Sequence, residues 1–523
     1  MSETETPKKG KKWGIMVYMA ADNNLSQDAI QGIGGIRRLL EQHRADLKDT
    51  EFFLYFDGNA FGFPSLQFDF SEPISTSNPI RFNREFRSSP ESICSFVKKC
   101  AKKEGFKEIE NFALIVSSHG FGFQEDSLLR DDSSRTSATV QDLADNIGKL
   151  NSEFLDRKLK ILGFDSCVMN MLEVANELRR SLGGSGDDLK DVFLVSSEGY
   201  VPNAGWSYSR ILEGLTRIEP KTPREMAELL VKSYIAEYEP SYEYSGLAID
   251  ISAFSLGLVD QLTEGVNAVG RGLLSLLKTE GIKRRVEKIL LDSHSRSQTY
   301  LYDQSVDIKD FCDLLQKELS EDKVIDEESD LNKTLIKMSE AFCPNVYCKT
   351  LGTENQFSNG MSLYFPWSFD TFLIILPRYR QLEFGRKPED VESLSDWGEF
   401  LFYYLFQTMR APDRCGSRTD DPVSERQNGL SNLAGDDRKN QETMMKLNTK
   451  HTVNGEFGEG LDRSRINPPD KSRINPPDKT RLGSAFVENF RRTRNIAWLP
   501  EPAFMRLTGK LTKKEKTMAR GSG

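Results

Sequence analysis

The chain has 523 residues, of which 38% are hydrophobic, and a formal net charge of −9. That length can bury a large core in more than one structural unit, which is enough for a folded enzyme. Its seven cysteines stand at scattered spacings without a CxxC pair. This pattern favours reduced thiols and argues against a disulfide scaffold or a zinc ribbon.

The charge is unevenly distributed along the chain. Residues 411–523 hold 22 Lys and Arg against 15 Asp and Glu, a net charge of +7, which leaves −16 for residues 1–410. An acidic body attracts cationic substrates at long range, although salt screens the effect. We therefore expect substrates that carry positive charge, and no nucleic-acid partner.

No stretch of the sequence has the length of an apolar membrane-spanning helix. The apolar run Ile15 to Ala21 follows a polar, basic start, is broken by a tyrosine and stops at Asp22. Such a run is too short for a signal peptide or a membrane span. We therefore expect a cytoplasmic protein without membrane contact.

Short apolar runs alternate with amphipathic ones from Trp13 to Gly214, which is typical of β-α-β units around a mainly parallel sheet. The expected strands are Gly14 to Met19, Glu51 to Phe56, Phe112 to Val116, Leu159 to Phe164 and Val192 to Ser196. The expected helices are Gln27 to Gln42, Pro90 to Lys103, Val140 to Leu150 and Val168 to Arg180. The pattern predicts an α/β domain over residues 13–214.

The pattern changes twice more along the chain. Residues 215–410 become mostly helical, with two strand-like runs, Gly246 to Ile251 and Met361 to Phe365, that either extend the sheet or form a small one. We expect this region to pack on the first domain. Residues 411–523 are polar and repeat SRINPPDK at 464–471 and 472–479, which predicts a disordered tail, as for residues 1–12.

Two expected strands end in reactive side chains. His119 follows the run Phe112 to Val116, and Cys167 follows Leu159 to Phe164. Functional groups gather where parallel strands end, so these two ends can bring an imidazole and a thiol together. We predict Cys167 as a nucleophile and His119 as its general acid and base. The competing interpretation is a structural histidine and a buried structural cysteine.

A thiol of ordinary pKa needs help to become a nucleophile at neutral pH. The helix expected from Val168 would direct the positive end of its dipole at the sulfur of Cys167. A nearby imidazole would take the proton of the thiol. Backbone amides at Gly120 and Cys167 are the candidate oxyanion hole, since glycine lets backbone approach a substrate closely.

Asp165 is the candidate partner of a cationic substrate side chain. If the chain stays extended through Cys167, residues 165 and 167 point to the same side. A site built for a guanidinium rejects a neutral side chain because the acid is then left unpaired. Glu198 is a second candidate that could line the same cleft. The alternatives are a helix cap for Asp165 and a solvent-facing acid for Glu198.

The motifs together resemble the clostripain family of cysteine peptidases from about Trp13 to Leu215. The matching segments are Tyr18 to Leu25, Ser118 to Gly120, Gly163 to Cys167 with Met169 and Glu173, Ser196 to Glu198 with Pro202, Gly205, Trp206 and Tyr208, and Gly360 to Pro366. The resemblance implies a caspase-like α/β/α sandwich and a catalytic dyad of His119 and Cys167. It also implies cleavage of peptides or proteins after Arg or Lys held by Asp165.

Peptidases of this kind are often activated by cutting themselves between the histidine and the cysteine. The polar stretch Asp126 to Ser137 carries Arg130 and Arg135, and we predict self-cleavage after one of them; an ordinary surface loop is the alternative. No cofactor is expected. The acids of this stretch lack EF-hand spacing, so that a need for calcium stays open, and no metal ligand is predicted.

Three other functions compete with a peptidase. A caspase-like scaffold without activity would serve as an interaction module, and its Cys167 would react no faster with iodoacetamide than the other thiols. A nucleotide-binding protein is disfavoured because Gly32, Gly34 and Gly35 lie inside an expected helix. A zinc hydrolase is disfavoured because no two histidines share a helix face. The oligomeric state is not readable from the sequence.

Overall fold

The computed structural model describes residues 12–47, 49–58, 65–70, 80–81, 87–245 and 248–409. The described residues up to Gln407 belong to one unit. The disorder expected for residues 1–12 and for the tail at 411–523 falls outside the described residues, apart from Lys12. Within the described ranges, no helix has both the length and the apolar composition needed to cross a bilayer.

A nine-stranded sheet runs through this unit in the order β13-β10-β9-β8-β5-β1-β2-β3-β4. The five strands from β9 to β2 are parallel, and antiparallel strands flank them on both sides. The strands are β1 (Trp13–Ala21), β2 (Thr50–Gly58), β3 (Leu66–Asp69), β4 (Ile80–Arg81), β5 (Asn111–Ser117), β8 (Leu159–Asp165), β9 (Phe193–Ser196), β10 (Ile249–Ser255) and β13 (Val346–Leu351). The predicted α/β class with a mainly parallel sheet is confirmed.

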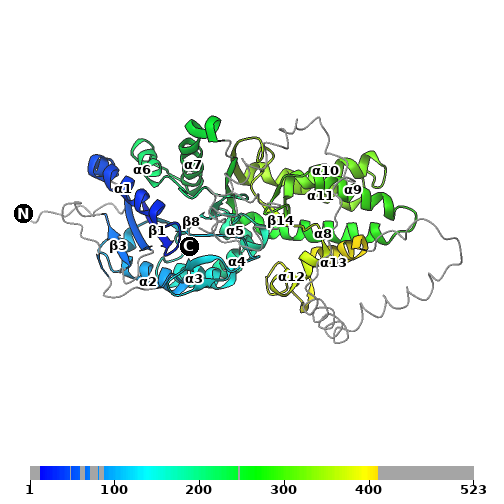
Figure 1. Ribbon diagram of the computed structural model, residues 1–523, viewed down its shortest axis with the longest axis horizontal. Helices are drawn as coiled ribbons and strands as arrows, with labels where there is room; N and C mark the ends of the chain where they lie inside the picture. Colours follow the sequence, from blue (N-terminus) through cyan, green and yellow to red (C-terminus); the bar gives the residue numbers. More distant parts are fainter. Residues whose placement is uncertain are drawn as a thin grey trace, which may run out of the picture. The chain divides into compact units, whose positions relative to one another are not determined.

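The apolar runs of the sequence become strands because helices cover both faces of the sheet. Every residue of β1 is buried, as expected for a parallel strand between two parallel neighbours. Figure 1 shows α1, α6 and α7 on one face and α2, α3 and α4 on the other. These helices are α1 (Ser26–His43), α2 (Pro90–Cys100), α3 (Val140–Glu153), α4 (Leu172–Leu182), α6 (Tyr208–Arg217) and α7 (Pro223–Ser245).

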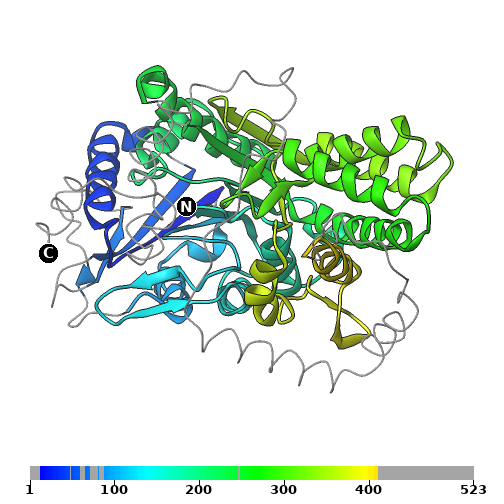
Figure 2. The same cartoon turned by 45° about the vertical axis from the view of Figure 1, so that its right-hand side comes forward.

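The C-terminal half of the unit is mostly helical, as predicted. Its helices α8 to α11 pack against one another and form the green group in Figures 1 and 2. The elements are α8 (Val259–Lys278), α9 (Lys283–Arg296), α10 (Ile308–Glu321), α11 (Asp330–Asn345), α12 (Phe369–Tyr379) and α13 (Asp396–Met409). Smaller elements are α5 (Gly186–Leu189), β15 (Arg386–Lys387) and β16 (Asp390–Leu394).

The two strand-like runs of this half have different fates. The first becomes β10, which extends the main sheet by pairing antiparallel with β9. The second becomes β14 (Ser362–Tyr364), which joins β11 (Thr299–Tyr300) and β12 (Ser305–Asp307) in a separate sheet. The strand β13, which the sequence pattern did not suggest, completes the edge of the main sheet. The main sheet therefore continues past residue 214, where we expected a domain boundary.

Candidate active site

The two reactive side chains follow neighbouring strands. β5 and β8 pair in parallel, and Ser117 lies opposite Asp165 at the last paired position of both. One residue further, the hydroxyls of Ser118 and Ser166 lie 3.2 Å apart. His119 is the next residue after Ser118, and Cys167 is the next after Ser166. The structure therefore brings the two residues to adjacent strand ends, as we expected.

Gly120 lies against the backbone of the cysteine. A Cβ atom added at Gly120 would meet the carbonyl oxygen of Cys167 at 2.6 Å and the Cβ of Ser166 at 2.9 Å. Only glycine permits this approach, since real Cβ atoms do not come so close to backbone. The contact holds the segment after His119 against the turn that carries the sulfur. The oxyanion role of the Gly120 and Cys167 amides stays a prediction.

His119 is buried and is oriented by the loop that follows β1. Its Nε2–H donates to Oδ1 of Asn24 over 2.7 Å. Asn23 fixes this loop, because its side-chain amide donates to the carbonyls of Ala20 and Arg130 and its oxygen accepts from the Leu25 amide. With the proton on Nε2, the lone pair of the neutral ring lies on Nδ1, which can take a thiol proton.

The Cys167 side chain is fully buried in this conformation. The amide of Val201 donates to Sγ over 3.2 Å, and the thiol donates to the carbonyl of the same residue over 3.6 Å. An N–H that donates to sulfur favours the thiolate over the thiol. Because the side chain is inaccessible in this conformation, a substrate reaches the sulfur only after the surrounding chain moves.

The predicted helix start at Val168 is wrong. The strand β8 ends at Asp165, the chain turns at residues 166–168, and α4 begins only at Leu172. Val168 has φ +56°, a costly conformation for a β-branched residue, and its amide donates to the carbonyl of Gly199 over 2.9 Å. The helix end therefore does not adjoin the sulfur, and the Val168 amide is already used. The N–H group at the sulfur comes from Val201 instead.

Asp165 is nearly inaccessible and heavily hydrogen bonded. Its Oδ1 accepts from the Trp206 amide over 3.0 Å, and its Oδ2 accepts from the hydroxyls of Ser117 and Tyr208 over 2.9 Å each. It does not cap the next helix, so that alternative is wrong. The carboxylate joins the ends of β5 and β8 to the segment that leads into α6.

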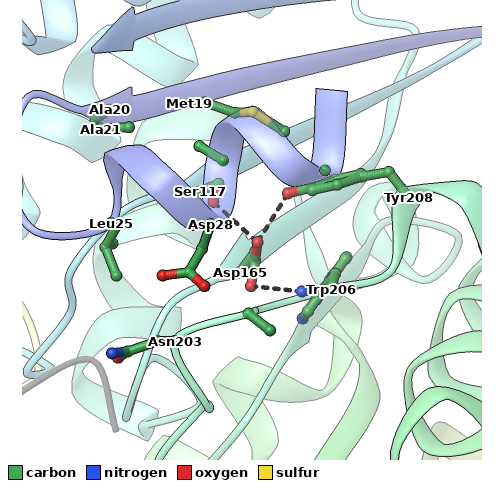
Figure 3. A pocket seen from close by; sticks show the side chains of 13 residues that line it. Met19, Ala20, Ala21, Leu25, Asp28, Ser117, Asp165, Asn203, Trp206 and Tyr208 are labelled. Atoms are coloured by element: carbon green, nitrogen blue, oxygen red, sulfur yellow. Dashed lines mark hydrogen bonds between the residues drawn. The ribbon is translucent and has the colours of Figure 1, made fainter. Parts of the chain in front are cut away.

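Asp165 also lines a small pocket beside the strand ends (Figure 3). The walls come from the end of β1, the first turns of α1 and residues 203–208. Asp28 of α1 lines the same pocket, and no lysine, arginine or histidine does. In this conformation the pocket leaves about 20 Å³, room for about one water molecule. A basic side chain therefore fits only after the walls separate.

The expectation that Glu198 lines this pocket is wrong. Its side chain is fully buried, and its Oε2 accepts from the Gly360 amide over 2.8 Å. The neighbouring carboxylates are those of Asp250 and Asp307. Glu198 points toward the C-terminal half because the backbone of residues 198 and 199 is held by the carboxylate of Asp250.

Burial raises the pKa of each acid in this second cluster. The pKa of Glu198 lies well above its usual value because of burial and the negative neighbours Asp307 and Asp250. Burial raises the pKa of Asp307 to about 7 and that of Asp250 to about 6. Each carboxyl also accepts backbone hydrogen bonds, which shows that these acids join loops to one another.

The expected self-cleavage loop is a hairpin. β6 (Leu128–Asp131) and β7 (Thr136–Ala138) pair antiparallel around a turn at residues 132–135. Arg130 lies in the first strand, where its carbonyl accepts from the side chain of Asn23 over 2.9 Å. Arg135 lies exposed in the turn with φ +55°. The two candidate sites therefore differ sharply in accessibility.

No group of three or more metal-ligating side chains is present within the described ranges. The calcium question therefore gains no candidate ligand set there. Acids of the hairpin segment have partners within the protein. Asp126 forms a bidentate ion pair with Arg378, and the carboxylate of Asp131 accepts a hydrogen bond from the Ser88 amide.

A mainly parallel sheet with a histidine and a cysteine at adjacent strand ends defines a caspase-like peptidase fold. The profile of the clostripain family, whose members are C11 cysteine peptidases, matches residues 17–400. The chain therefore belongs to the clostripain family, and the resemblance noted from its motifs is confirmed. The clostripain family consists of cysteine endopeptidases, which are hydrolases.

Individual relatives are distant. Clostripain of Hathewaya histolytica is 26% identical over 235 residues, which cover 39% of this chain and 42% of that protein. The chain thus aligns with less than half of that relative. A secreted C11 cysteine protease from Bacteroides thetaiotaomicron, solved with an irreversible peptide inhibitor, is 14% identical, with a TM-score of 0.51 over 75% of this chain and 99% of that one. At this identity the likeness shows a shared fold.

A third relative is an inactive zymogen C11 protease from Parabacteroides distasonis. It is 18% identical, with a TM-score of 0.49 over 72% of this chain and 97% of that one.

Sequence reasoning missed several residues that lie beside the site. Asn24 stood inside a quoted motif, but no local pattern indicates that it reaches His119. Asp28 and Asn203 line the pocket from two other parts of the chain, and Val201 contacts the sulfur. Their roles depend on contacts between distant segments, for which a single sequence carries no signal.

Proposed function

We propose that this chain is a cysteine endopeptidase that hydrolyses peptide bonds after a basic residue, with Cys167 as nucleophile and His119 as general acid and base. The observation that carries the proposal is the pairing of β5 with β8, which sets both side chains at adjacent strand ends. Membership of the clostripain family supports it.

The chemistry follows from the orientation of the imidazole. Nδ1 of His119 takes the thiol proton, and the thiolate of Cys167 attacks the substrate carbonyl carbon. The tetrahedral intermediate collapses to a thioester as the amine leaves with the proton from the imidazolium. Water, deprotonated by the same imidazole, then hydrolyses the thioester and restores the thiol. Amides near Gly120 are the proposed donors to the oxyanion.

Specificity for a basic side chain is the finer part of the proposal. The pocket beside the strand ends contains carboxylates and no cationic residue, so it favours a positively charged guest. The net charge of −16 on residues 1–410 acts in the same direction at longer range. Cleavage after Arg or Lys follows from these two features.

One observation favours the alternative of an inactive interaction scaffold. The Cys167 side chain is fully buried, and its sulfur forms hydrogen bonds with both the backbone amide and the carbonyl of Val201. An inert structural thiol has such surroundings. The same burial fits an uncleaved chain that opens on activation. Turnover separates the two, because a scaffold hydrolyses no peptide before or after cleavage.

Fluorogenic peptides that differ only in the residue before the scissile bond test the proposal. The unmutated protein should hydrolyse the Arg and Lys peptides, and Cys167→Ala and His119→Ala should lose at least about 100-fold in kcat/KM. The matched control is Cys94→Ala, since Cys94 is a free thiol away from the strand ends. Equal hydrolysis by Cys167→Ala would contradict the proposal.

The remaining expectations are part of the same proposal. Peptides or proteins are the proposed partners, and the chemistry needs no cofactor because a thiol and an imidazole suffice. The cytoplasmic location stays a prediction. Activity that survives EDTA without loss is the expected result for calcium, and a loss restored by added Ca²⁺ would contradict it.

A further inference from the structure

We infer that Tyr302, in the turn between β11 and β12, is an autoinhibitory latch. Its ring holds the segment 200–204 closed on Cys167, and withdrawal of the ring opens the site. The C-terminal half of the chain thereby controls access to the nucleophile. The inference rests on the proposed peptidase function and adds a regulatory contact to it.

Two segments that contact Cys167 each carry an aromatic ring next to the contact. Gly120 lies against the carbonyl oxygen of Cys167, and the residue that follows it is Phe121. Val201 forms hydrogen bonds with the sulfur through both its amide and its carbonyl, and the residue that precedes it is Tyr200. The rings of Phe121 and Tyr200 therefore belong to two pieces of chain that touch the nucleophilic residue.

Tyr302 joins these two pieces of chain from the C-terminal half. Its ring centroid lies 6.3 Å from that of Phe121, at an interplanar angle of 45°, and 6.3 Å from that of Tyr200, at 60°. Tilted aromatic pairs at such separations attract one another. Burial raises the pKa of Tyr302 to about 12, and the charges of Glu125 and of a Cys167 thiolate raise it too. The ring therefore lies within electrostatic range of the sulfur.

The segment 200–204 is fixed at both ends. Before it, the amides of Glu198 and Gly199 donate to the carboxylate of Asp250 over 2.7 and 2.9 Å. After it, the carbonyl of Gly205 accepts from the hydroxyl of Tyr238 over 2.7 Å. Gly205 also has φ +63°, a conformation that glycine adopts without strain. Opening is therefore a movement of the few residues between these two ends, which include the contacts of the sulfur.

The turn that carries Tyr302 is strained. Leu301, Tyr302 and Asp303 follow one another with φ of +53°, +57° and +60°, the left-handed region that is costly for residues other than glycine. The Thr299 hydroxyl donates to Oδ1 of Asp303 over 2.7 Å, and the Gln304 amide donates to the carbonyl of Leu301 over 3.2 Å. Strain of this kind persists only where such contacts hold it, and it is common at switch regions. Because withdrawal of Tyr302 relieves the strain, the closed turn is poised to open.

The rate at which iodoacetamide alkylates Cys167, measured by mass spectrometry of the digested chain, tests the latch. All variants also carry Arg135→Ala, so that self-cleavage in the hairpin does not open the site beforehand. Tyr302→Ala removes both ring contacts and should speed the alkylation of Cys167 by at least about 5-fold relative to this parent chain. Tyr302→Phe keeps the ring and should stay within about 3-fold of the parent.

Tyr403→Ala is the matched control. Tyr403 is partly exposed, like Tyr302, but it lies on α13, where two lysine side chains lie over its ring. Its replacement should leave the alkylation rate of Cys167 unchanged. Cys312 on α10 is buried and serves as an internal reporter of general unfolding. Its alkylation should stay equally slow in all the chains.

The outcomes separate this inference from the peptidase proposal. If the chain hydrolyses no peptide but Tyr302→Ala speeds the alkylation of Cys167 alone, the peptidase proposal fails and the latch stands. If arginine peptides are hydrolysed and Tyr302→Ala leaves the alkylation rate unchanged, the latch is overturned and the peptidase stands. Equal acceleration at Cys312 also overturns the latch, because the whole unit is then loosened. Equal acceleration in Tyr302→Phe overturns it because the ring is then not what holds the segment.

Discussion

At the scale of single residues, the imidazole of His119 depends on a partner outside the two strand ends. Oδ1 of Asn24 accepts a hydrogen bond from Nε2–H of His119, and Asn23 fixes the loop that carries Asn24. The hydrogen bond selects the tautomer that leaves Nδ1 as base, so Asn24 is a positioning residue of the proposed dyad.

We expect Asn24→Ala to lower kcat by about 10-fold with little change in KM, because the imidazole loses its orientation. Asn24→Asp should instead raise the pKa of His119, since a carboxylate stabilises the imidazolium, and should move the acid limb of the pH–rate profile upward. Gln27→Ala, a change at an exposed neighbour, is the control. An unchanged pH profile in Asn24→Asp would show that the side chain has no influence on the imidazole.

The placement of His119 and Cys167 at adjacent strand ends could be predicted because each follows shortly after an apolar run, and run ends are visible in the sequence. The orientation of these side chains could not, because Asn24 and Val201 come from segments far away along the chain. Glu198 illustrates the same limit. Its position after a strand predicted that Glu198 lines the substrate cleft. Hydrogen bonds with Gly360 and Asp250 instead hold Glu198 away from the pocket.

At the scale of elements, the strands and most helices follow their apolar patterns to within a few residues. The start of α4 does not. Residues 167–178 are all buried, so apolar residues at Val168 and Met171 carry no information on where the helix begins. The turn is set by tertiary hydrogen bonds instead, from the amides of Val168 and Asn170 to the carbonyls of Gly199 and Ser197.

The hairpin of β6 and β7 decides between the two candidate self-cleavage sites. The Arg130 carbonyl is held by Asn23, and the next residue, Asp131, is buried. Arg135 lies in an exposed polar turn, the kind of site that proteases cut first. If the chain cleaves itself in this segment, we expect the cut after Arg135.

Intact mass of the purified chain checks this prediction. The unmutated protein and Arg130→Ala should each give two fragments, with masses that correspond to cleavage after Arg135. Arg135→Ala and Cys167→Ala should stay uncleaved. A cut that persists in Cys167→Ala must come from another protease. A cut after Arg130 would mean that the strand opens more readily than the turn.

At the scale of the whole described unit, buried carboxylates of α4 and of the segment after β9 accept hydrogen bonds from backbone amides of the C-terminal half. Glu173 accepts from the Tyr364 amide, Glu177 from the Glu383 amide and Glu198 from the Gly360 amide. A single sequence does not show which distant amides such acids bind, so these three hydrogen bonds could not be predicted.

Burial raises the pKa of Glu173 to about 7. Because the folded chain then binds this proton more tightly than the unfolded chain, the stabilising contribution is fully present below about pH 4.5 and is lost as the pH rises through about 7. Glu173→Gln keeps an oxygen for the Tyr364 amide and removes the titration. The free energy of unfolding of Glu173→Gln, minus that of the unmutated chain, should therefore rise by about 3 kcal/mol from pH 4 to pH 8.

Thermal unfolding from pH 4 to pH 8 measures this effect. The melting temperature of Glu173→Gln, minus that of the unmutated chain, should rise across this window. Glu280→Gln, a change at an exposed acid, should show a constant difference. A constant difference for Glu173→Gln too would mean that Glu173 titrates as an exposed acid does.

The proposed activity requires Cys167 to be a nucleophile, with His119 as its base and a pocket for basic side chains beside it. Labelling with a peptidyl chloromethyl ketone that ends in arginine, followed by mass spectrometry of the digested chain, tests this most directly. The expected result is one label per chain, on Cys167, and none in His119→Ala. No label on Cys167, or equal labelling of the other thiols, would contradict it.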